Sequence, residues 1–136
     1  MTFYNLFISH SWSYSKSYEG LVSLLNQADN FSYKNYSVPK YDPIHGARTD
    51  AELREAIRKQ MAPASVVIIL AGVYATHSEW INKEIRLAKS GFSTPKKIIA
   101  IEYWGSERTS QVVKNAADRV VKWNTASIVK AIKELS

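Results

Sequence analysis

Five short apolar runs alternate with five helical patterns along the chain, and this alternation constrains the fold more than any other feature. The run at 65–70 lacks polar alternation, which is typical of a strand buried on both faces of a parallel sheet. We expect an α/β fold: a flavodoxin-like, doubly wound, parallel five-stranded sheet with helices on both faces. Strands are expected at 3–9, 33–38, 65–70, 97–101 and 119–121, and helices at 14–28, 49–61, 76–89, 110–116 and 124–135.

The length and composition indicate one folded domain. The chain has 136 residues, of which 46% are hydrophobic, so we expect a single domain spanning 1–136. The absence of cysteine excludes disulfides and zinc–thiolate sites. The longest apolar run, 66–73, is too short to span a bilayer, and the first five residues lack the basic start of a signal peptide. We therefore expect a soluble cytoplasmic protein.

The net charge of +6 favours an anionic partner, such as a nucleic acid, a dinucleotide or an acidic protein. The basic residues, however, are scattered along the sequence and form no stripe with aromatic residues. Such a distribution is typical of solvated helix faces. Nucleic-acid binding would rest on net charge alone, and we do not expect it.

Aromatic, hydroxyl and carboxylate side chains follow several of the predicted strands. In open α/β sheets, ligands bind beyond the carboxyl ends of the strands. Such side chains suit a ligand with flat rings and ribose groups. Alternatively, each aromatic ring closes the end of the hydrophobic core. In strand order, the residues at these ends include Ser9, His10, Ser11 and Trp12, then Tyr41 and Asp42, then Tyr74, then Glu102 and Trp104, and finally Trp123.

Several activities common among flavodoxin-like folds lack their motifs here. A phosphate receiver needs an aspartate at the end of the third strand, where residues 70–72 are Leu-Ala-Gly. Neither G-x-G-x-x-G nor a P-loop occurs, so no bound redox dinucleotide is expected. The three histidines, His10, His45 and His77, lack metal-ligand spacing, and G-x-S-x-G is absent. We therefore expect neither a metal site nor a Ser-His-Asp hydrolase.

The predicted helix 76–89 carries the most informative carboxylate. Trp80 and Glu84 are four residues apart and share a helix face, which Leu87 continues. This line lies about 100° from an apolar stripe, so Glu84 should border the core. Glu79 is explained by a capping box with Thr76. The apolar stripe consists of Ile81, Ile85 and Ala88.

A second interpretation gives Glu84 no role in a functional site. On a solvated helix face it would pair with a basic neighbour such as Lys83, Arg86 or Lys89. Spacing alone slightly favours this interpretation. The aromatic residues at the strand ends and the resemblance described next favour a site.

Two segments resemble motifs of TIR domains. Residues 7–11, FISHS, resemble the opening at the end of the first TIR strand, and residues 78–84 resemble the segment S-x-W-x-x-x-E. The similarity extends over essentially the whole chain. It is closest to the TIR-like subfamily of the Thoeris antiphage system, whose pattern is similar at 36–39, 42–44, 68–74 and 123–124.

The resemblance implies an enzyme of the NAD⁺ glycohydrolase or ADP-ribosyl cyclase type, with Glu84 as its catalytic residue. NAD⁺ would be the substrate, with no further cofactor, and the product a cyclic ADP-ribose-type signal in bacterial antiphage defence. The implied partners are a phage-derived trigger, further copies of the chain on activation, and a separate effector that responds to the signal. Residues 41–46 depart from the usual Arg-Asp-x-x-Pro-Gly loop, which helps other TIR domains to assemble.

The predicted site follows from this chemistry. Cleavage of the nicotinamide–ribose bond creates an oxocarbenium-like ribose, and Glu84 would hold the ribose hydroxyls and stabilise the positive charge. The alternative function is a non-enzymatic TIR-like scaffold that binds a protein partner or a nucleotide. The remaining predicted substrate-binding residues are Trp80 and Trp12, which would stack on the flat rings, Ser9, His10 and Ser11 beside the ribose and phosphates, and Asp42 and Tyr74.

Overall fold

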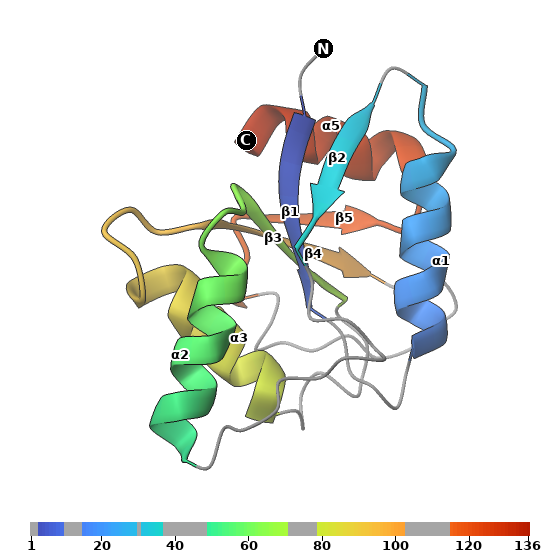
Figure 1. Cartoon of the computed structure of the whole chain (residues 1–136). Coiled ribbons are helices and arrows are strands. Elements are labelled where there is room, and N and C mark those ends of the chain that lie inside the picture. Colours follow the sequence, from blue (N-terminus) through green and yellow to red (C-terminus); the bar gives the residue numbers. More distant parts are fainter. Residues whose placement is uncertain (1–2, 10–14, 30, 37–48, 71–78, 103–114) are drawn as a thin grey trace.

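The computed structural model describes residues 3–9, 15–29, 31–36, 49–70, 79–102 and 115–136 (Figure 1). Five parallel strands form one sheet in the order β2-β1-β3-β4-β5. This order is the flavodoxin-like one, and the predicted fold class is confirmed. The strands are β1 (Phe3–Ser9), β2 (Ser32–Asn35), β3 (Val66–Leu70), β4 (Lys97–Glu102) and β5 (Arg119–Lys122); the helices are α1 (Ser15–Asn26), α2 (Asp50–Met61), α3 (Glu79–Ser90) and α5 (Thr125–Leu135).

The apolar run at 65–70 forms the central strand. Val66, Val67, Ile68 and Ile69 are completely buried, because β3 lies between β1 and β4 and both of its faces are covered. β2 and β5 are the outer strands of the sheet. β2 is shorter than the predicted 33–38. The N–H of Tyr36 still donates to the carbonyl of Leu6 (2.8 Å), and residues 37 and 38 lie outside the described residues.

Alternation along the strands divides the core into two layers. Phe7, Val67, Ile69, Ile98 and Ala100 project toward α2 and α3. The residues between them project toward α1 and α5, where Leu21, Leu25, Ile128 and Ile132 cover them. Figure 1 shows α2 and α3 together on one side of the sheet and α1 and α5 on the other. The α2–α3 layer is the one that carries Glu84.

Side-chain caps begin two of the helices, and a glycine follows the end of α3. Thr49 caps α2, its hydroxyl accepting from the N–H of Glu52 (3.1 Å), and Asn124 caps α5 by accepting from the N–H of Ser127 (2.8 Å). After α3, the N–H of Gly91 donates to Leu87 (2.7 Å), and a Cβ at Gly91 would lie 2.7 Å from that carbonyl oxygen.

Other helix predictions fall outside the described residues. Thr76 of the predicted capping box before α3 is in this group. The helix predicted at 110–116 is described only at 115 and 116, which are helical. None of the described helices is long and apolar enough to cross a membrane.

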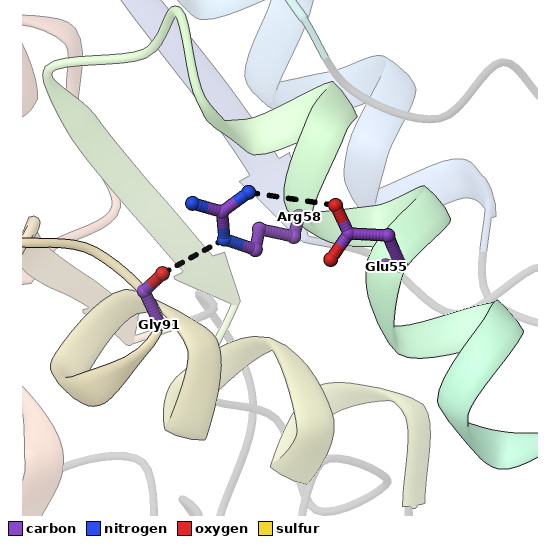
Figure 2. Close-up of polar contacts among 3 residues, drawn as sticks. All are labelled: Glu55, Arg58 and Gly91. Atoms are coloured by element: carbon purple, nitrogen blue, oxygen red, sulfur yellow. Dashed lines mark hydrogen bonds and ion pairs between the residues drawn. The ribbon is translucent and has the colours of Figure 1, made fainter.

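Polar contacts join the ends of α2 and α3. They lie at the amino edge of the sheet, which is the edge where the strands begin. Arg58 of α2 donates from Nε to the carbonyl of Gly91 (2.8 Å) and pairs with Glu55 (3.5 Å; Figure 2). The ring of Phe92 lies between Arg58 and Lys96, with centroid distances of 5.1 and 4.6 Å. These contacts fix the end of α3, and therefore the rotation of its buried face.

Lys96 completes this arrangement from the segment before β4. Its ammonium donates to the carbonyls of Ala62 (2.8 Å) and Ala64 (2.7 Å), which follow α2. Burial lowers the pKa of Lys96, while the two carbonyl oxygens and the Phe92 ring favour its charged form. Lys96 therefore gives a charged donor to two backbone carbonyls just beyond the end of α2.

Replacement of Lys96 by Met is expected to lower the free energy of unfolding by about 1–3 kcal/mol, because two carbonyl groups lose a charged donor. Urea denaturation of the full chain measures the change. The control is Lys97→Met, at the exposed neighbouring position, which should change stability by less than about 0.5 kcal/mol. Equal effects of the two substitutions would contradict the role of Lys96.

Candidate functional site

Glu84 is a completely buried carboxylate, with 0% of its surface exposed. It lies on α3 three and four residues before Leu87 (1% exposed) and Ala88 (0%), so these side chains form one stripe toward the sheet. The prediction that Glu84 borders the core is therefore confirmed, and the burial is greater than predicted. Ile85, which was placed in the middle of the apolar stripe, lies at its margin with 9% exposure.

The solvated interpretation of Glu84 is wrong. Arg86 and Lys89 are exposed, on the opposite side of the helix from the buried stripe. The ammonium of Lys89 lies 3.8 Å from a carboxylate oxygen of Asp118, which in turn accepts the N–H of Ile98 at 2.8 Å. The side chain of Lys83 lies outside the described residues. Because charged residues are seldom fully buried, the position of Glu84 indicates a role other than solubility.

The packing of α3 places Glu84 toward the carboxyl edge of the sheet, where the strands end. α3 follows the end of β3 and leads back to the start of β4, where the N–H of Lys96 donates to the carbonyl of Ala88 (2.8 Å). Glu84 is about one turn closer to the carboxyl edge than Ala88. In open α/β sheets this is the edge where ligands bind.

The structure describes only two of the predicted substrate-binding residues, and only their backbone. Ser9 is the last residue of β1 and pairs in register with Ile69, and Trp80 lies in the first turn of α3. The side chains of these two residues are outside the described part of the structure. The other members lie entirely outside the described residues: His10, Ser11, Trp12, Asp42 and Tyr74. Their roles stay predictions.

A second carboxylate at the carboxyl edge was not predicted as a site residue. Glu102 ends β4, two residues after Ala100 and four after Ile98, and both of these belong to the α2–α3 layer. Alternation therefore places Glu102 on the same side of the sheet as Glu84. The ammonium of Lys122, paired with it in register on β5, lies 3.8 Å from its Oε1. Because side chains alternate along a strand, the positions of Ile98, Ala100 and Glu102 at every second residue predict from the sequence that the three share one side of the sheet.

Trp123 was one of the aromatic residues at the strand ends, for which a ligand site and a core position were both open. It packs against the α1–α5 layer. A Cβ at Gly20 of α1 would lie only 3.1 Å from Cζ2 of the indole, so the small residue makes room for the ring. Trp123 therefore closes the core on the side of the sheet away from Glu84.

The described part of the chain contains no group of three histidine, cysteine, aspartate or glutamate residues placed to hold a metal ion. The described site is a buried carboxylate with a second, salt-bridged carboxylate on the same side of the sheet. Its chemistry is that of two carboxyl groups on one side of the sheet near the carboxyl edge. Such an arrangement can stabilise a cationic group or accept hydrogen bonds from hydroxyl and amine donors.

Comparison with known proteins identifies the family. Residues 7–108 match the family described as Thoeris protein ThsB, TIR-like domain. The match covers more than half of the chain, including the last three residues of β1, all of β3 and β4, and the whole of α3 with Glu84. A search of curated proteins returns no match. The chain belongs to the Thoeris ThsB TIR-like domain family and has a TIR-domain role in antiphage defence.

Proposed function

We propose that the chain cleaves NAD⁺ at the bond between nicotinamide and ribose and converts the remainder into a cyclic ADP-ribose-type signal in the cytoplasm. The observation that carries the proposal is the complete burial of Glu84 at the position of the S-x-W-x-x-x-E motif. TIR-like domains often cleave NAD⁺, and in those enzymes the last residue of this motif is catalytic. The family match agrees with the proposal.

The chemistry requires one carboxylate. When the C–N bond breaks, its electron pair stays on the nicotinamide nitrogen, which becomes neutral, so the leaving group needs no proton. Positive charge develops on the ribose, as in glycoside hydrolysis. A carboxylate removed from water interacts with that charge more strongly than a solvated one. Glu84 would also accept hydrogen bonds from the ribose hydroxyls and so fix the sugar.

The fate of the ribose depends on which nucleophile reaches it. Attack by water, with loss of a proton, gives ADP-ribose, whereas attack by a nucleophilic atom of the same molecule closes a ring. Exclusion of water from the site favours ring closure. Trp80 and Trp12 are proposed to stack on the rings, and the remaining predicted residues to line the sugar and phosphate side: Ser9, His10, Ser11, Asp42 and Tyr74.

The proposed function includes a regulated assembly. A phage-derived trigger would cause self-association and switch on the activity, and a separate effector would bind the product. The test uses the purified full chain and extracts of phage-challenged cells that express it. Mass spectrometry is expected to show release of nicotinamide and a cyclic ADP-ribose-type product. Absence of NAD⁺ turnover in both the resting and the challenged states would refute the enzyme and favour the non-enzymatic scaffold.

A further inference from the structure

Glu102 and Glu84 come from different elements but face the same side of the sheet. Glu84 belongs to the stripe of α3 that packs on the α2–α3 layer. Glu102 continues the row of Ile98 and Ala100 in that layer. Of the β4 side chains on this side of the sheet, Ala100 is the smallest, and it is the one next to Glu102. The topology therefore directs two acidic groups toward one region at the carboxyl edge.

The backbone hydrogen bond between Lys96 and Ala88 is a common reference point for the positions of Glu84 on α3 and Glu102 on β4. Glu84 lies four residues along α3 from this point, about 6 Å at 1.5 Å per residue. Glu102 lies six residues along β4 from it, about 20 Å at 3.3 Å per residue. Helical side chains lean toward the start of their helix, which here is the carboxyl edge. The two carboxylates are then roughly 10 Å apart along the sheet, and Glu102 is the outer one.

The environment of Glu102 suits recognition of a neutral donor. Its side chain is 25% exposed, whereas that of Lys122 is 80% exposed, so the carboxylate is the more desolvated partner of the pair. The ammonium of Lys122 lies 3.8 Å from the Glu102 carboxylate. A carboxylate accepts hydrogen bonds from N–H groups and repels a second carboxylate. NAD⁺ carries two such N–H donors, the amine of adenine and the carboxamide of nicotinamide, and the carboxamide belongs to the ring that is attached to the reacting ribose.

Resting on the proposed cleavage of NAD⁺, we propose that Glu102 determines substrate specificity by accepting a hydrogen bond from the carboxamide N–H of nicotinamide. The spacing of about 10 Å along the sheet is comparable to the length of a ribose with its attached nicotinamide ring. The acid analogue, in which a carboxylate replaces the carboxamide, offers no donor and meets a like charge. A site built for a donor rejects a ligand that lacks it.

The test compares the binding of two probes, NAD⁺ and nicotinic acid adenine dinucleotide, to the full chain by calorimetry. The native chain is expected to bind NAD⁺ at least about tenfold more tightly than the acid analogue, and Glu102→Gln to reduce this preference by about tenfold. The control is Glu134→Gln, which removes an exposed carboxylate paired with Arg119 on the α5 side of the sheet and should leave the preference unchanged. A preference unchanged in Glu102→Gln would overturn the inference, as would a native chain that binds neither probe.

Turnover of NAD⁺ by Glu84→Gln separates this inference from the proposed function. If Glu84→Gln loses turnover while Glu102→Gln keeps the native preference, cleavage stands and the role of Glu102 falls. If Glu102→Gln loses the preference while the native chain cleaves no NAD⁺ in any state, the chain recognises the nicotinamide end without cleaving it. Thermal unfolding of both variants shows whether a loss comes from misfolding, since substitution by Gln preserves the volume of the side chain.

Discussion

Replacement of Glu84 by Gln is expected to lower NAD⁺ turnover by about 100- to 1,000-fold, because the neutral amide cannot stabilise the positive charge that develops on the ribose. The substitution preserves the size of a side chain that is completely buried between α3 and the sheet. Binding of NAD⁺ should weaken much less than turnover, since an amide oxygen still accepts hydrogen bonds from ribose hydroxyls. Initial rates of nicotinamide release, measured under the conditions in which the native chain is active, give the ratio.

The matched control for this result is Glu52→Gln, which makes the same chemical change at an exposed position of α2. It should keep the turnover of the native chain within about twofold. Thermal unfolding should show that Glu84→Gln stays folded at the assay temperature. A folded Glu84→Gln variant that turns over NAD⁺ as fast as the native chain would remove Glu84 from the mechanism.

The largest expected loss of stability comes from the central strand. Ile68→Ala should lower the free energy of unfolding by about 2–5 kcal/mol, because a completely buried side chain leaves a cavity between the sheet and the α1–α5 layer. Urea denaturation measures this change. Val120→Ala, on the edge strand β5 with 38% exposure, should cost less than about 1 kcal/mol. Similar costs for the two variants would contradict the burial of Ile68 beneath the α1–α5 layer.

The sequence predicted the sheet well because its strands have clear physical signatures. The unbroken apolar run of β3 requires cover on both faces, and the regular alternation of strands and helices requires crossover connections, so the parallel order follows. Thr49 and Asn124 were identifiable as caps because their side chains bond to N–H groups only three residues away. The end of β2 was less predictable, since the strand lies at the edge and is paired only with β1.

The candidate site depended on packing that the sequence does not encode locally. Helical spacing placed Glu84 beside the apolar stripe, but the rotation of α3 is set by its contacts with the sheet and by those of Arg58 with Gly91. These distant contacts bring Glu84 fully into the core and move Ile85 to the margin. The choice between a site and a core position for Trp123 likewise required the position of α1. Sequence patterns define faces, whereas tertiary contacts decide which face is covered.

The central claim is that the buried carboxylate of Glu84 makes this chain an NAD⁺-cleaving enzyme of antiphage defence. The most direct test is to measure NAD⁺ and its products by mass spectrometry in phage-challenged cells that express either the native chain or Glu84→Gln at equal levels. We predict that a cyclic ADP-ribose-type product accumulates, with release of nicotinamide, in cells with the native chain and not in cells with Glu84→Gln. Equal product levels in the two, or no product with the native chain, would contradict the claim.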